Sequence, residues 1–414
     1  MMKINRKYCF LSVLLVVLPI LVYFPTFQND FLFYWDDQWQ VTNRFSSGDF
    51  TFENLYLIFS QSNGGQYSPI NQLMYTALYT FFGYNPVAFH AASLIVHIIN
   101  TLLVYSLLIG VFDKTEEMLK INIRIIAFMS ALLFAIHPVN VESVAWVSAS
   151  KIPVYTLFYL AGLNAYLKYI ENERIKWFIF TIFCFIISFG CKEQTVTFPV
   201  SLLLIDWFLG RKLRSEKILV EKIPFFVLSL FFGLVTVTVN GLSSGVSDYP
   251  FGQRLLFSCY AIFEYITKTL LPIQLNYLYP FPMDAGNAIP LKFWIFPFLI
   301  LGLSFLPVIY RKNRIVMFGV LWFFIHISLS LNIISLGRYA MIADRYLYIG
   351  ITGLSIIITY IVNVLYSKYN KLIVSVLFTV YLCYLGTYTF IYTQKWQNSD
   401  TVKQYLRELS EDKK

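Results

Sequence analysis

Two adjacent carboxylates, Asp36 and Asp37, lie inside an aromatic stretch near the start of this 414-residue chain, in the sequence FLFYWDDQWQ. A carboxylate held beside a reacting hydroxyl group can act as a general base. Two neighbouring carboxylates also repel each other, which keeps one of them more basic. The pair is therefore a candidate for proton abstraction, with a solvated loop pair as the alternative. The flanking Trp35 and Trp39 also fit anchors at a membrane surface.

Further charged side chains lie at the ends of apolar runs, in three short motifs. These motifs are AIHPVNVESVAWVSASK with His137, Glu142 and Lys151, SFGCKEQTVTFP with Lys192 and Glu193, and LGRYAMIADRYLYI with Arg338, Asp344 and Arg345. Lysine and arginine hold phosphate groups, whereas an aspartate can remove a proton. Each motif alone also fits a local ion pair, but their convergence on one predicted face favours a shared site.

The composition is that of a membrane protein, because 57% of the residues are hydrophobic and only 13% are charged. Soluble domains carry about a quarter charged residues. Apolar runs of about twenty residues recur along the chain and predict an all-α polytopic membrane protein. The net charge of +9 does not indicate nucleic acid, since the basic residues cluster between apolar runs. The five cysteines show no disulfide or metal-ligand spacing.

Eleven membrane spans are predicted from these runs, with the N-terminus in the cytoplasm, the first helix uncleaved and the C-terminus outside. They cover residues 8–27, 88–112, 124–140, 152–170, 177–190, 195–209, 222–240, 291–310, 315–336, 347–366 and 372–393. This arrangement places the basic clusters 3–7, 211–222, 311–314 and 368–371 on the cytoplasmic side.

The segment 254–273 is also apolar enough to span, but a crossing there would move the basic cluster 311–314 outside. Glu264 and Lys268, four residues apart, favour an interfacial amphipathic helix instead. The sequence therefore predicts long outer loops at 28–87 and 241–290, each with amphipathic helices. Together with the spans they form one domain, 1–393, followed by a short outer tail, 394–414, predicted as a helix.

Six motifs together resemble one known family. They are FYWDDQWQVTN, YSPI at 67–70, FHAASLIVHIINTLLVY at 89–105, HPVNVESVAW at 137–146, KEQTVTFPVSLLLIDW at 192–207 and DRYLYIG at 344–350. In this order they resemble the membrane half of the O-mannosyltransferases that combine transmembrane helices with tetratricopeptide repeats, and their bacterial relatives. These enzymes belong to the GT-C superfamily of glycosyltransferases.

This resemblance implies a GT-C fold and a polyprenyl-phosphate sugar, undecaprenyl or dolichyl, as the donor. The base would be Asp36, with Asp37 orienting it or the acceptor. The donor phosphate would be held by Lys151, Lys192 and Arg345, and Glu142 and Glu193 would fix these cations or contact the sugar. Supporting roles fall to His137, Tyr67, Asp344 and Arg338. A single displacement with one base inverts the anomeric centre.

The resemblance also sets expectations for the acceptor and the location. The acceptor would be a hydroxyl group on a protein, a glycan or a lipid. The active site would face outward from a bacterial cytoplasmic membrane, or into the lumen of the endoplasmic reticulum in a eukaryote. Asp36 and Asp37 are hard oxygen ligands of the kind that a divalent metal prefers. No further carboxylate or histidine cluster accompanies them, so no metal or other cofactor is expected.

Two departures and two alternatives accompany this interpretation. Ser68 stands where the family has an arginine in its Tyr-Arg-Pro-Leu motif, and no tetratricopeptide repeat follows the predicted tail helix. A ligase or polymerase that uses a lipid-pyrophosphate glycan would need Arg and His in a large outer loop, and the 241–290 loop has only Arg254. A lipid-linked sugar transporter would place charged residues near the bilayer midplane, whereas here they gather at helix ends.

Overall fold

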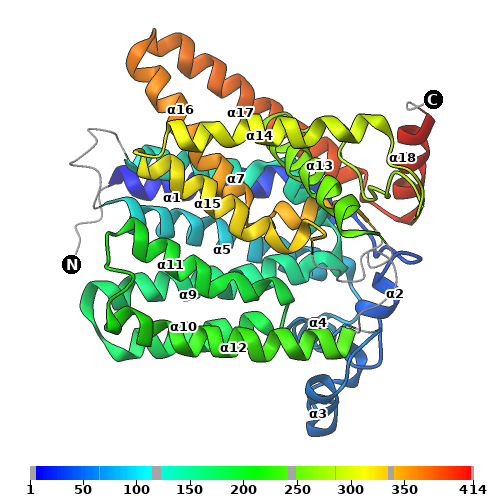
Figure 1. The fold of residues 1–414 in the computed structure, drawn as a ribbon. Helices are drawn as coiled ribbons and strands as arrows, with labels where there is room; N and C mark the ends of the chain where they lie inside the picture. The colour runs from blue at the N-terminus through cyan, green and yellow to red at the C-terminus, as the bar shows by residue number, and fades with distance from the viewer. Residues whose placement is uncertain are drawn as a thin grey trace.

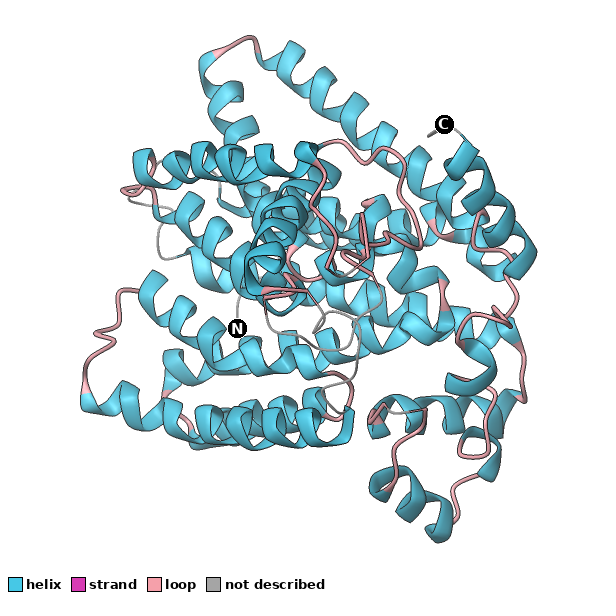
Figure 2. Cartoon of the chain, turned by 45° about the vertical axis from the view of Figure 1, so that its right-hand side comes forward, coloured by secondary structure: helices cyan, strands magenta, loops and turns pink. Residues whose placement is uncertain are grey.

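The computed structural model describes residues 6–64, 66–113, 123–240, 249–284, 286–333 and 340–411, and within these ranges the chain forms helices and no strand (Figures 1 and 2). The α-helices are α1 (Arg6–Val22), α2 (Asp37–Gln40), α3 (Phe52–Ser60), α4 (Pro69–Phe82), α5 (Pro86–Phe112), α7 (Ile123–Ile136), α8 (Val141–Ala145), α9 (Lys151–Asn172), α10 (Ile175–Phe189), α11 (Phe198–Phe208), α12 (Glu216–Asn240), α13 (Phe251–Leu270), α14 (Ile295–Ile309), α15 (Arg314–Ile327), α16 (Ile351–Lys368), α17 (Lys371–Gln394) and α18 (Ser399–Glu411). The predicted all-α class is confirmed.

Several of these helices are long and apolar enough to cross a membrane. By length and composition, five segments of the described residues qualify: Pro86–Phe112, Glu216–Thr236, Leu291–Ile309, Ile351–Lys368 and Lys371–Gln394. A sixth is added if Ile123–Ile136 and Pro138–Ala145 count as one bent span. The other predicted spans also coincide with helices (α1, α9, α10, α11 and α15). The chain is thus a multi-pass membrane protein, while the number of eleven spans and their orientation stay predictions.

The predicted span 124–140 is not a continuous helix, because the chain bends by 48° between α7 and the segment Pro138–Ala145. His137 precedes Pro138 and has an extended backbone, φ −76° and ψ 129°, as residues before proline prefer. Its Nδ1 accepts a hydrogen bond from the Val139 N–H at 3.3 Å, and its Nε2 lies 3.0 Å from the Thr269 carbonyl oxygen. The residues that follow the bend form three short helices, η4 (Pro138–Asn140), α8 and η5 (Val147–Ser150).

The long helices lie alongside one another and leave the shorter elements at one end (Figure 1). Helix α5 packs against α7 and α9, α9 packs against α10, and α16 packs against α7 and α15. In Figure 1 the N-terminus lies at the left end of this bundle, whereas α2, α3, α4, α13 and α18 lie at the right end. Asparagine caps satisfy the first free N–H groups of several helices, as Asn85 does for Val87 in α5 and Asn370 for Leu372 in α17.

Helices form in both predicted outer loops and in the tail. In the first loop they are α2, α3 and α4, and the tail contains α18. The predicted helix at 254–271 is α13, whose buried residues Phe257, Ala261, Tyr265 and Lys268 follow the spacing of one helix face. Residues 241–248 and 285 of the second loop lie outside the described residues.

Helices α15 and α16 approach closely at two glycines, which fixes the start of α16. A Cβ atom at Gly353 would lie 2.7 Å from the backbone nitrogen of Phe323, and one at Gly319 would lie 2.6 Å from the carbonyl oxygen of Gly353. Next to this crossing, the Trp322 indole N–H donates to the carbonyl oxygen of Ile349 at 3.0 Å. The crossing therefore positions the segment 344–350 that precedes α16.

Replacing Gly353 by valine should lower the melting temperature of the purified protein in detergent. The added side chain has to displace the backbone of α15, and such overpacking costs about 1–3 kcal/mol. Gly302→Val in α14 is the control, because a Cβ atom there meets no atom within 4 Å. Equal melting temperatures for the two variants would show that the glycine crossing does not constrain the helices.

Candidate active site

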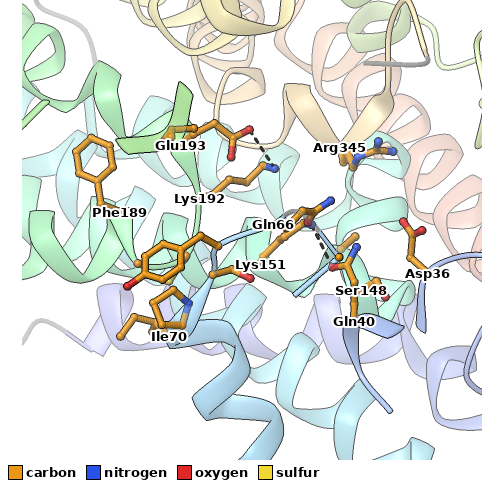
Figure 3. A pocket seen from close by; sticks show the side chains of 18 of the residues that line it. Asp36, Gln40, Gln66, Ile70, Ser148, Lys151, Phe189, Lys192, Glu193 and Arg345 are labelled. Carbon is orange, nitrogen blue, oxygen red and sulfur yellow. Dashed lines mark hydrogen bonds and ion pairs between the residues drawn. The ribbon is translucent and has the colours of Figure 1, made fainter. Parts of the chain in front are cut away.

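A cavity of about 840 Å³ lies at the end of the bundle where the short helices gather. Its walls come from distant parts of the sequence: the first loop, the segment 146–151, the end of α10 with residues 190–193, the end of α12, and residues around 277 and 345. Figure 3 shows Asp36 and Arg345 on one side, Phe189 and Ile70 on the other, and Lys151 between them. Asp36 and Arg345 thus lie at one side of the cavity and apolar side chains at the other, with Lys192 and Glu193 on the Phe189 side of Lys151.

The two adjacent aspartates occupy different environments. Asp36 is half-buried and lines the cavity, and its Oδ1 accepts a hydrogen bond from the Trp39 indole N–H at 3.2 Å. Asp37 is fully buried and is not among the cavity-lining residues. It accepts bonds from the Leu32 N–H at 2.7 Å, from the Ser148 N–H at 3.0 Å and from the Ser148 hydroxyl group. The pair therefore contains one carboxylate that faces the cavity and one that joins two chain segments.

Burial raises the pKa of both carboxyl groups. For Asp37 burial outweighs the bonds from Ser148 and Leu32, and its pKa is about 6. Burial also raises the pKa of Asp36 above its ordinary value, although the charge of Lys151, the bond from Trp39 and the charge of Arg345 act in the opposite direction. A carboxylate with a raised pKa is a better proton acceptor at neutral pH than an ordinary aspartate.

Lys151, the first residue of α9, extends toward the first loop. Its Nζ donates to the side-chain oxygens of Gln40, at 3.1 Å, and of Gln66. Burial, together with the nearby charge of Lys192, lowers the pKa of Lys151 to about 7. The amine has neutral hydrogen-bond partners, so no contacting carboxylate cancels its charge.

The two other predicted cations each contact a carboxylate. The guanidinium group of Arg345, in the 3-10 helix η10 (Asp344–Leu347), forms an ion pair with the fully buried Glu142. The same carboxylate accepts from the Arg345 backbone N–H at 2.8 Å. Lys192 Nζ lies 3.6 Å from an Oε atom of Glu193. All three cations, Lys151, Lys192 and Arg345, line the cavity, although they come from different helices.

The remaining predicted residues are distributed unevenly. Tyr67 lines the cavity and donates its hydroxyl hydrogen to the Phe59 carbonyl oxygen at 2.8 Å. His137 lies at the bend described above, away from the cavity lining. Asp344 is buried and accepts from the Tyr279 hydroxyl group at 2.9 Å, and burial raises its pKa to about 7. Arg338 lies outside the described residues.

Four residues of the site were missed by the sequence analysis: Gln40, Gln66, Ser148 and Trp146. Gln40 lies close to the acidic pair, in WDDQWQ, and Ser148 and Trp146 lie in the motif that contains Lys151. Their positions within these motifs could have indicated that they belong to the site. Gln66 had no such signal, because its contact with Lys151 spans 85 positions. Trp146 packs against Tyr277 with ring centroids 5.2 Å apart, and Arg345 lies over its ring.

The arrangement can hold an anion between cations and accept a proton at Asp36. Among the described residues, no three His, Cys, Asp or Glu side chains come together as metal ligands. The chemistry available from these side chains is therefore proton transfer and electrostatic stabilisation of a leaving group. Metal independence stays a prediction.

Comparison with known proteins gives relatives of one kind. The chain is 27% identical over 180 residues to the protein O-mannosyl-transferase TMTC2 of Mus musculus, which covers 42% of this chain and 20% of the relative. It is 27% identical over 247 residues to the protein O-mannosyl-transferase F38B6.6 of Caenorhabditis elegans. This match covers 56% of this chain and 32% of that relative. It is 29% identical over 150 residues to the protein O-mannosyl-transferase TMTC4 of Homo sapiens. This match covers 33% of this chain and 20% of that relative.

These matches confirm the resemblance to O-mannosyltransferases that the motifs indicate. The matched region spans about a fifth to a third of the length of these relatives. No protein-family model matches the chain.

Replacing Asp37 by alanine should destabilise the protein more than replacing Asp36 by alanine. The first change leaves the buried N–H groups of Leu32 and Ser148 without an acceptor, and each such loss costs about 1–3 kcal/mol. Asp36→Ala removes a half-buried carboxylate with one bond to Trp39. Thermal unfolding of the two variants in one detergent measures the difference. An Asp36 variant that melts at or below the Asp37 variant would contradict this division of roles.

Proposed function

We propose that this protein is a membrane glycosyltransferase that moves a single sugar from a polyprenyl-phosphate donor to an acceptor hydroxyl group. The observation that carries this proposal is the cavity, in which Asp36 shares the walls with three cations, Lys151, Lys192 and Arg345. The relatives named as protein O-mannosyl-transferases support the reaction class. Mannose as the sugar and a protein as the acceptor are carried over from those names as part of the proposal.

The cavity has an apolar wall that suits the polyprenyl chain of such a donor. This wall is built from Ile186 and Phe189 of α10 and from Phe232 and Val235 of α12. The same two helices expose apolar side chains on their outer faces: Ile179, Phe180 and Phe183 on α10, and Val227, Leu230, Phe231 and Leu234 on α12. Those faces suit contact with lipid. A chain lying along α10 and α12 enters the cavity at its apolar side.

The donor phosphate then lies beside Lys192 and Lys151, because these cations stand between the apolar wall and Asp36 (Figure 3). The sugar extends past Lys151 toward Asp36 and Arg345. This order matches the structure of the donor, in which the sugar and the lipid are attached to opposite sides of one phosphate. The sugar and the acceptor then occupy the side of the cavity that Asp36 and Arg345 line.

The reaction in this arrangement is a single displacement. Asp36 accepts the proton of the acceptor hydroxyl group while the hydroxyl oxygen forms a bond to the anomeric carbon. The bond between that carbon and the phosphate oxygen breaks, and its electron pair leaves with the polyprenyl phosphate. Lys151 and Lys192 stabilise the developing negative charge. One displacement of this kind inverts the anomeric centre.

The other charged residues position these groups. Asp37 holds the start of α2, so that Asp36 lines the cavity, and Glu142 fixes Arg345 through two hydrogen bonds. Glu193 holds Lys192 at one side of the cavity. We assign Asp37 and Glu142 as positioning residues, since neither lines the cavity, whereas Glu193 lines it beside Lys192.

We also propose an orientation of the protein in the membrane. The turns with basic clusters after α11 and between α16 and α17 lie at the end of the bundle that also holds the N-terminus (Figure 1). Positive loops favour the cytoplasmic side, which supports a cavity on the outer or luminal face. The donor lipid is then undecaprenyl phosphate in a bacterial cytoplasmic membrane, or dolichyl phosphate in the endoplasmic reticulum.

Purified protein in detergent should consume one member of a panel of polyprenyl-phosphate sugars when cell extract supplies the acceptor. Asp36→Asn should lower this rate by about 100- to 10,000-fold, because a general base contributes that much, while the melting temperature stays that of the wild type. Donor consumption that persists in Asp36→Asn would contradict the role of Asp36. A wild-type protein that consumes none of the donors would contradict the proposed reaction.

Lys192→Ala should lower kcat/KM for the donor on the order of 100-fold, because it removes a cation beside the leaving phosphate. Lys192→Arg should recover part of the loss, since the charge is restored. Lys292→Ala is the control, because Lys292 is exposed and does not line the cavity. Wild-type kinetics in Lys192→Ala would remove this residue from the phosphate site.

A further inference from the structure

A tight turn of the first loop lies against the ring of Trp39, beside the candidate base. The turn is formed by Asn63, Gly64 and Gln66, in which the N–H of each of Asn63 and Gln66 donates to the carbonyl oxygen of the other at 2.9 Å. Gly64 has a left-handed backbone with φ +55°, and a Cβ atom there would lie 2.5 Å from two ring carbons of Trp39. The backbone of Gly64 therefore packs directly on the indole face, where only glycine fits.

The same turn also contacts the backbone of Trp39. The side-chain amide of Asn63 donates to the Trp39 carbonyl oxygen at 2.6 Å, and Asn43 donates to that oxygen at 2.9 Å. The indole is thus held from the ring face and from the main chain. Its Nε1–H points to Asp36 Oδ1 at 3.2 Å.

The far side of the turn reaches the donor-phosphate site. The side-chain oxygen of Gln66 accepts a hydrogen bond from Lys151 Nζ, next to the bond that Gln40 accepts. One short segment therefore contacts both the residue that bonds the base and the cation beside the proposed phosphate position. Neither Gly64 nor Asn63 carries a group that can take part in the reaction.

We infer that Trp39 is the positioning residue for Asp36 and that the turn of Asn63, Gly64 and Gln66 holds Trp39 and Lys151 in register with each other. This inference rests on the proposed function, because it assigns how the base and the phosphate-binding lysine are kept at fixed places. The indole N–H orients the carboxylate and favours its charged form. The turn acts through the ring of Trp39 and through the bond that Gln66 accepts from Lys151.

The test compares Trp39→Phe with the wild type and measures the protonation of Asp36 directly. Protonated carboxyl groups react with a carbodiimide, and fragment-ion mass spectrometry, which separates modification at Asp36 from modification at the adjacent Asp37, gives the modified fraction of Asp36 at each pH without any substrate. Phenylalanine keeps the ring but lacks the N–H, so the midpoint of modification should move to higher pH by about one unit. In parallel, the acid limb of the rate of donor consumption should move in the same direction, with the KM for the donor unchanged.

Gly64→Ala should move the midpoint in the same direction, because the added methyl group displaces the indole from Asp36. Gly83→Ala is its matched control: Gly83 also has a left-handed backbone, φ +60°, but a Cβ atom there meets no atom within 4 Å. The control should keep the wild-type midpoint.

A wild-type midpoint in both Trp39→Phe and Gly64→Ala would overturn the inference. The carbodiimide measurement separates this failure from failure of the proposed function. If the wild type consumes no donor while the midpoint still moves in the two variants, the positioning of Asp36 holds and the reaction assigned to it is wrong.

Discussion

The buried carboxylate of Asp37 is the contact on which the geometry of the cavity depends. It accepts hydrogen bonds from Leu32 on its own segment and from Ser148, 111 positions away, and so ties the first loop to the chain that follows the bend at His137. Burying a carboxylate costs free energy unless the carboxylate accepts hydrogen bonds. Asp37 accepts these bonds only when the two segments lie side by side as they do here. Tyr34, three residues earlier, has a left-handed backbone with φ 71°, a conformation that a non-glycine residue adopts only when its surroundings hold it there.

Pairing of charges distinguishes the two ends of the bundle. At the end opposite the cavity, Asp206 lies 2.7 Å from both Arg211 and Lys222, and Glu221 lies 2.9 Å from Arg211. These charges form a compact network that joins the end of α11 to the start of α12. In the cavity, by contrast, Arg345 and Lys192 each contact a carboxylate, whereas Lys151 contacts the neutral side chains of Gln40 and Gln66. In the proposed function, Lys151 is therefore the cation available to the donor phosphate.

The sequence predicted the helices well and the roles of single residues less completely. Long apolar runs fix the positions of helices because a segment in lipid has to satisfy its own backbone, and each predicted span overlaps a helix of the described residues, although the span 124–140 is bent. The bend at His137 was readable from the dipeptide His137-Pro138, yet the long apolar run concealed it. The acidic pair was identified from the sequence. Which of its carboxylates faces the cavity depends on the contact between Asp37 and Ser148, which lie in distant segments of the chain. The turn at Gly64 and its packing on Trp39 were out of reach for the same reason, since nothing in QSNGGQ indicates which ring it covers.

The proposed reaction requires a lipid-linked sugar phosphate to lie between the apolar wall and Asp36. A structure of the protein bound to a polyprenyl-phosphonate sugar analogue, which cannot transfer its sugar, would show where the donor lies. We expect the phosphonate group beside Lys151 and Lys192, the lipid chain along α10 and α12, and the anomeric carbon facing Asp36. A phosphonate group bound elsewhere, or a sugar that points away from Asp36 toward Phe189, would contradict it.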